Sequence, residues 1–286
     1  MRPSEPRTSD VRQPTKIAEG REAEIFSWDE RTVLRLYRDP NACGRADREI
    51  VALDAVRSAL PCVPASHGRK DWNGRPGILL QRVDGRGILS EIQHRPWRMW
   101  ALAALCGRVH ADLNALRAPA NLPEQRSELR RRIVGEPSIP AELREAALHE
   151  LDRMPDGDAL CHGDFHPDNV LLCPSGPVVI DWPNATRGEA CGDFARTALM
   201  MHLGALAPGA PPLIRWGQWA CRGVFTRAYV AGYEETRRYD DEALRQWKFV
   251  RAVDRLADKL PEERDPLLRA ADRLRGELQA RSSAAG

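Results

Sequence analysis

The feature that most constrains this chain is a polar loop, residues 162–169, set between short apolar runs. Apolar residues occupy 159–161 before the loop and 170–172 after it, and Gly176-Pro177 then predicts a turn. A third apolar run at 178–180 follows that turn. Runs of this length, bounded by turn residues, are typical of buried strands. The segment therefore predicts strand, loop, strand, turn and strand, with polar side chains gathered at one end.

Three of these polar side chains form a chemical set suited to phosphoryl transfer. They are Asp164 and Asn169 in the loop and Asp181 directly after the third run. One carboxylate can orient an attacking hydroxyl group and accept its proton. An amide oxygen and a second carboxylate can hold Mg²⁺ on a nucleoside triphosphate. We therefore expect Asp164 to be catalytic, and Asn169 and Asp181 to bind the metal ion.

Two other interpretations of the loop have less support. A plain polar turn would not require an amide at this offset and a carboxylate at the end of the next apolar run. A zinc site could use His162, His166 and Cys161, but Gly163 and Pro167 prevent one helix from presenting both imidazoles. The chain also has no Cys-x-x-Cys pair that could complete such a site.

The order His-Gly-Asp-x-x-x-x-Asn at 162–169, followed by Ile-Asp-Trp at 180–182, resembles the aminoglycoside phosphotransferase family. That family shares the protein-kinase-like fold. The resemblance implies an α+β, bilobal molecule, with a small antiparallel sheet and one helix in the N-terminal lobe and a larger, mainly helical C-terminal lobe. It also implies that His162 holds the loop by hydrogen bonds and that Asp193, at a helix start, braces it. ATP and Mg²⁺ are the implied cofactors.

Composition and periodicity divide the chain into three segments. Residues 1–13 are polar and charged and contain prolines, so we expect a flexible N-terminal arm. Residues 14–85 contain strand-like runs and one helical pattern, and correspond to the nucleotide-binding lobe. Residues 86–286 are mainly helical and correspond to the catalytic and substrate-binding lobe. Within this third segment, Trp97 and Trp100 are predicted to lie on the apolar stripe of a helix.

In the N-terminal lobe, the resemblance implies a nucleotide site made of a glycine loop, a strand cation, a helix carboxylate and backbone between the lobes. The positions are Gly20, Arg21, Arg35, Glu49, Gln81 and Val83. The family pattern has Lys on the third strand, where this chain has Arg35. Arg keeps the positive charge, but it is longer and binds in a forked geometry. Glu49, on the following helix, is the expected partner of Arg35.

Charge and cysteine content exclude several classes of partner. The 286 residues carry a formal net charge of +2, which gives no reason to expect a nucleic-acid partner. No run of about 18 apolar residues predicts a membrane span, and the first residues lack the apolar segment of a secretory signal. The seven cysteines are scattered and odd in number, which favours reduced side chains over disulfides. We expect a cytoplasmic monomer that acts on a hydroxyl group of a small molecule.

The acceptor itself is less constrained. Candidate contacts are His166 and Asp168 in the loop, Glu189 after it, and Glu234 and Glu235 in a later helix. Carboxylates would suit the cationic aminoglycosides on which the family acts, so an antibiotic kinase is the first hypothesis. A choline- or homoserine-type metabolite kinase is the alternative, and Arg35 leaves open a catalytically impaired nucleotide-binding module. A protein kinase is not indicated, because the chain lacks His-Arg-Asp, Asp-Phe-Gly and Ala-Pro-Glu.

Overall fold

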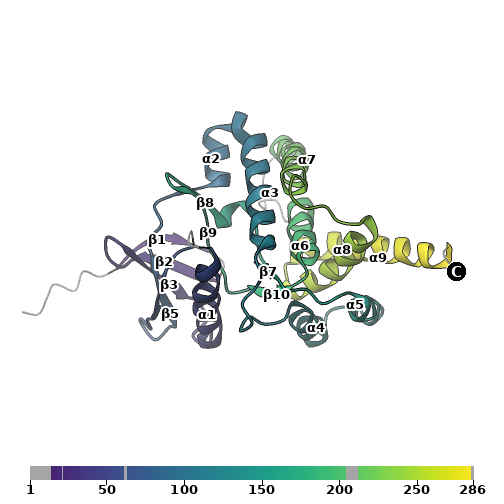
Figure 1. Ribbon diagram of the computed structural model, residues 1–286, viewed down its shortest axis with the longest axis horizontal. Helices are drawn as coiled ribbons and strands as arrows, with labels where there is room; N and C mark the ends of the chain where they lie inside the picture. Colours follow the sequence, from purple (N-terminus) through teal and green to yellow (C-terminus); the bar gives the residue numbers. More distant parts are fainter. Residues whose placement is uncertain (1–13, 21, 61–62, 204–211, 285–286) are drawn as a thin grey trace, which may run out of the picture.

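Alternating apolar residues in the first part of the chain form an antiparallel sheet. The computed structural model describes residues 14–20, 22–60, 63–203 and 212–284, so the expected arm at 1–13 and Arg21 lie outside the described residues. The sheet consists of β1 (Thr15–Glu19), β2 (Ala23–Ser27), β3 (Thr32–Tyr37), β4 (Ser66–Arg69) and β5 (Gly77–Gln81). Its strand order is β1-β2-β3-β5-β4, so β3 lies at the centre (Figure 1).

The central strand β3 is buried on both faces. Leu34 and Leu36 pack with Phe26 on one face. Tyr37 packs on the other face, against helix α1 (Cys43–Ala59). Because side chains two apart in a strand share a face, Arg35 lies on the α1 side with Tyr37, where it is only 9% exposed. The fold thus holds one cation between the sheet and the helix.

Helices make up most of the remaining chain, as the predicted α+β, protein-kinase-like architecture requires (Figure 1). They are α2 (Ile88–His94), α3 (Met99–Ala115), α4 (Gln125–Gly135), α5 (Ala141–Arg153), α6 (Ala190–Leu203), α7 (Pro212–Glu234), α8 (Asp241–Arg255) and α9 (Pro261–Ala284). Helices α3 and α7 cross closely, since a Cβ atom on Gly107 would lie 2.1 Å from Tyr229 O. Glycine is therefore required at that crossing.

Short strands connect the sheet to the helices. Strand β6 (Arg86–Gly87) pairs with β8 (Val170–Cys173), which pairs with β9 (Gly176–Val179). Strand β7 (Ala159–Cys161) pairs with β10 (Thr186–Gly188). The chain first joins this second group of strands at β6, directly after residue 85, where the lobe boundary is predicted. No helix among the described residues combines the length and apolar character needed to cross a membrane.

The predicted position of two tryptophans is wrong. Trp97 is 77% exposed and Trp100 is 54% exposed. Trp97 lies in a short 3-10 turn, Pro96–Arg98, before α3 begins, so it does not follow the phase of the α-helix. Trp100 lies on α3 roughly 200° around the helix from the buried Leu102, because successive residues turn by about 100°.

Candidate active site

The predicted polar loop leaves β7 and returns to β8 through a 3-10 turn, Pro167–Asn169. Gly163 adopts φ +77, and a Cβ atom there would lie 2.2 Å from Asn184 O. Only glycine combines this positive φ with so close a backbone approach. The loop is therefore pressed against the segment that follows Asp181.

A buried carboxylate on α6 fixes the start of this loop. Asp193 is fully buried and accepts hydrogen bonds from His162 N at 2.7 Å and Gly163 N at 2.8 Å. It also interacts with His110 Nε2 at 3.0 Å and Asn114 Nδ2 at 3.2 Å. Burial by itself would raise the pKa of Asp193, but the hydrogen bond with His110, together with the nearby His162 and Arg251, holds the pKa well below its ordinary value. Asp193 is thus an ionised anchor for the loop.

His162 joins the two polar segments of the site. Its Nε2 lies 3.1 Å from Ile180 O, and its Nδ1 accepts a hydrogen bond from Asp164 N at 3.2 Å. These partners correspond to a neutral imidazole whose proton is on Nε2. Burial lowers the pKa of His162, which also favours the neutral form. The side chain therefore holds backbone on both sides.

Asp164 has an arginine as its principal partner. Arg196 Nη2 on α6 lies 3.2 Å from Asp164 Oδ1, and His166 Nε2 lies 3.9 Å from Asp164 Oδ2. Burial would raise the pKa of Asp164, but Arg196 and then His166 keep the pKa below its ordinary value. Because 28% of the side chain stays exposed, this ionised carboxylate can still meet a hydroxyl group from solvent.

Asn169 connects Asp164 to the residue that precedes Asp181. Asn169 Nδ2 donates to Asp164 O at 3.0 Å, and Asn169 O accepts from Ile180 N at 2.9 Å. The second bond places Asn169 beside the residue that precedes Asp181. Asp181 has φ 70, a left-handed conformation that is uncommon outside glycine. The structure thus brings the three predicted residues together at one end of β7, β8 and β9.

A buried ion pair connects this end to the N-terminal sheet. Arg35 Nη2 lies 2.7 Å from Asp181 Oδ1, and Arg35 Nε lies 3.1 Å from Glu49 Oε2. Tyr37 Oη donates to the same Glu49 oxygen at 2.5 Å. Burial raises the pKa of Glu49, which is 1% exposed, and the Arg35 guanidinium opposes that rise. Arg35 therefore contacts both Glu49 on α1 and Asp181, the predicted metal ligand.

The sequence that forms this site matches a known family. Residues 14–233 match the sequence profile of the phosphotransferase enzyme family. The chain belongs to this family. The match confirms the resemblance to aminoglycoside phosphotransferases that the loop indicated.

Solved structures share the protein-kinase-like fold at low sequence identity. A thermostable mutant of the aminoglycoside phosphotransferase APH(4)-Ia, in ternary complex with ADP and hygromycin B, has a TM-score of 0.57 at 19% identity and covers 94% of this chain and 92% of its own. The amicoumacin kinase hAmiN, with AMP-PNP, Ca²⁺ and Ami, has a TM-score of 0.57 at 14% identity, with coverage of 93% and 88%. A choline/ethanolamine kinase family protein from Mesorhizobium loti has a TM-score of 0.58 at 12% identity, with coverage of 95% and 88%. No curated sequence matches the chain.

The other residues expected to contact the nucleotide differ in whether their backbone groups are already engaged. Gly20 lies in the turn between β1 and β2 and donates to Ala23 O at 2.8 Å. The backbone N–H of Gln81 donates to Ala65 O at 2.8 Å, so it is used inside the sheet. Val83 lies two residues beyond β5 and outside any strand. Of the two residues between the lobes expected to contact a nucleotide, Gln81 has its N–H engaged, so Val83 remains the candidate.

The expected acceptor contacts do not form one group. His166 borders Asp164, whereas Asp168 is exposed on the 3-10 turn. Glu189 lines a separate cavity of about 550 Å³ that also borders Ala159, at the opposite end of β7 from the loop. Glu234 and Glu235 are exposed at the end of α7, where Glu235 pairs with Arg108 at 3.2 Å.

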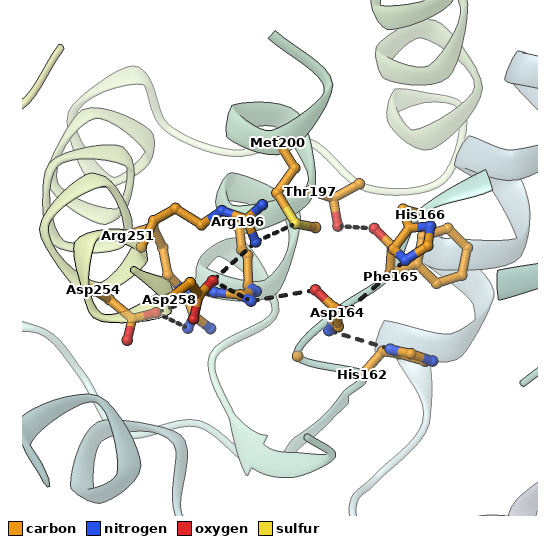
Figure 2. A network of polar contacts seen from close by, with 12 residues as sticks. His162, Asp164, Phe165, His166, Arg196, Thr197, Met200, Arg251, Asp254 and Asp258 are labelled. Atoms are coloured by element: carbon orange, nitrogen blue, oxygen red, sulfur yellow. Dashed lines mark hydrogen bonds and ion pairs between the residues drawn. The ribbon is translucent and has the colours of Figure 1, made fainter. Parts of the chain in front are cut away.

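A cluster of arginines and aspartates beside Asp164 was missed in the sequence. Arg196 contacts Asp254 at 3.3 Å and Asp258 at 3.4 Å, as well as Asp164 (Figure 2). Arg132 contacts the same two aspartates from α4. One signal could have located the cluster. Arg196 follows Asp193 by three residues, and residues at this spacing share a helix face.

Proposed function

We propose that this protein is an ATP-dependent kinase that transfers the γ-phosphoryl group to a hydroxyl group of a small molecule. Asp164 accepts the hydroxyl proton and aligns the oxygen with the phosphorus atom. Arg35 contacts the phosphates from the sheet, the turn that begins at Gly20 covers the nucleotide, and Val83 supplies backbone to it. The observation that supports this proposal is that Asn169 bonds both to Asp164 and to Ile180, the residue before Asp181.

The residues present fit a magnesium ion. Because Asn169 Nδ2 is engaged by Asp164 O, its Oδ1 atom is the group left for a cation. Asp181 adds a carboxylate that is 30% exposed. Amide and carboxylate oxygens suit a hard cation that retains nucleotide phosphates as further ligands. The metal ion would neutralise charge on the transferring phosphoryl group.

Two acceptor classes follow from the family. The first is an antibiotic, as in the aminoglycoside and amicoumacin kinases that share the fold. The second is a small metabolite, and one observation favours it. Asp254 and Asp258, the acidic residues joined to Asp164 through Arg196, are already paired with arginines. They are therefore poorly placed to bind the ammonium groups of a polycationic antibiotic.

The test is a nucleotide titration followed by an acceptor screen. We expect wild-type protein with Mg²⁺ to bind ATP and to consume it with one acceptor among aminoglycosides, other antibiotics, choline and homoserine. Asp164→Asn should lower turnover by about 100-fold or more while leaving ATP affinity unchanged. Asp156→Asn is the matched control, since that side chain is 87% exposed and distant from the loop. Failure of wild type to bind ATP would overturn the proposal.

A further inference from the structure

A small cavity of about 90 Å³ lies behind the catalytic loop, between α1, α4 and α8. Its lining includes Gly163 of the loop and Thr186 of β10. Six of the side chains around it are arginines, whereas the acidic ones are Glu128 and Asp254. The arginines are Arg45, Arg48, Arg131, Arg132, Arg196 and Arg251. The lining therefore holds more arginines than carboxylates, in a protein whose net charge is close to zero.

Most of these arginines already have a carboxylate partner. Arg45 pairs with Glu22 at 2.7 Å and Arg131 pairs with Glu128 at 2.7 Å, while Arg132 and Arg196 each contact Asp258 as well as Asp254. Asp254 is 1% exposed and is shared by Arg132, Arg196 and Arg251, with distances of 2.6, 3.3 and 3.5 Å. Arg48 is exposed and has no ion pair with any residue in the described part of the chain. Free cationic capacity therefore remains at the cavity rim.

Two buried polar atoms in the lining have no partner among the described residues. One is Nε of Arg196, a residue that is 7% exposed. The other is Oγ1 of Thr186, which is 8% exposed. Both atoms can donate to an anionic oxygen. Buried donors without partners are costly, so a ligand that supplies acceptor atoms would be stabilised there.

We propose that this cavity binds a small oxyanion, either free phosphate or sulfate or the carboxylate or phosphate group of a larger ligand. Guanidinium groups bind such oxyanions through paired, charge-assisted hydrogen bonds. Occupancy has a structural consequence. Arg45 and Arg48 lie on α1, which also carries Glu49, while Arg196 contacts Asp164 directly. A bound oxyanion thus ties the α1 helix to the catalytic loop.

The anion-binding assay contains no nucleotide. Its result therefore does not depend on whether the protein acts as a kinase. Wild-type protein is titrated with potassium phosphate, against potassium chloride at matched ionic strength, by calorimetry and thermal unfolding. We expect saturable phosphate binding with a raised Tm. Arg48→Gln should weaken it by about tenfold, the loss of one charged contact. Arg273→Gln is the control, because Arg273 is 67% exposed on α9.

A second arm distinguishes the source of the oxyanion. Gluconate is compared with sorbitol, in which a hydroxymethyl group replaces the carboxylate. Saturable binding of phosphate, weakened about tenfold in Arg48→Gln, supports a free-anion site. Binding of gluconate but not sorbitol, with the same loss, supports a site for an acidic group of a larger ligand. The proposal is overturned if neither anion binds beyond chloride, or if Arg48→Gln and Thr186→Val, both folded, bind as wild type does.

Discussion

Replacement of Asp193 by asparagine should release the catalytic loop from the body of the protein. Asp193 Oδ1 accepts one hydrogen bond, from Gly163 N, whereas Oδ2 is within hydrogen-bond distance of donors on His162, His110 and Asn114. An asparagine must place an NH₂ group at one of these two positions. Its better orientation sacrifices the single bond to Gly163 and keeps an oxygen for the other three donors.

The expected loss can be worked from those contacts. The Gly163 N–H would face another donor, and an unpaired buried donor costs about 1–3 kcal/mol. Each remaining bond would lose its charge assistance, which is worth about 1 kcal/mol per bond. Relief from burying a charge offsets part of this sum. We therefore expect Asp193→Asn to lower the free energy of unfolding by about 3–5 kcal/mol, a large share of the 5–15 kcal/mol typical of a native protein.

Denaturant unfolding of wild type and Asp193→Asn measures this difference. Asp272→Asn, with a side chain that is 59% exposed, is the control and should change the free energy by less than about 0.5 kcal/mol. The folded-state pKa of Asp193 is depressed, so its contribution is complete above the unfolded pKa of about 4 and declines as the pH falls below that value. A loss under 1 kcal/mol at neutral pH, or one that does not shrink in acid, would refute this reasoning.

Three further substitutions test other contacts. Gly163→Ala should destabilise the protein in denaturant unfolding and abolish turnover. Gly44→Ala is its control, because the space around the Cβ position of residue 44 is open. That substitution should be neutral or stabilising by up to about 1 kcal/mol. Arg35→Ala should cost about 3 kcal/mol in the same measurement, because it leaves a buried carboxylate without its cation, and should weaken ATP binding in a nucleotide titration. Arg196→Met should raise the pKa of Asp164 and so move the acid limb of the kcat/KM profile to higher pH; an unmoved limb would contradict the assigned pairing.

Much of the fold could be predicted because its signals are local. Strands β2, β3 and β5 follow apolar runs with turn residues at both ends, and α1 follows helical spacing that ends before Pro61. The strands β6 and β10 were missed, since two or three residues are too few to show a period. Their pairing partners, β8 and β7, are distant in sequence.

The candidate catalytic residues could be found in the sequence for the same reason. Asp164 and Asn169 lie in one loop, and Asp181 ends the next apolar run, so a short window of sequence contains all three. The partners of Asp164 lie elsewhere. Arg196 and Asp254 are 58 residues apart and meet only when α6 packs on α8. In a chain with 43 basic and 41 acidic residues, no local pattern marks which ones pair.

Arginine at positions 35 and 196 has a physical consequence at this site. Both carboxylates expected to take part in transfer already have a guanidinium partner, Arg35 for Asp181 and Arg196 for Asp164. Arg35 contacts Glu49 at the same time through another nitrogen of its guanidinium group. Lysine has a single ammonium group, which acts as a point charge and lacks this forked geometry. These partners reduce the repulsion among clustered carboxylates. Under the proposed function, a metal–nucleotide complex would compete with Arg35 for Asp181, and the Arg35 guanidinium would then be free to contact phosphate oxygens.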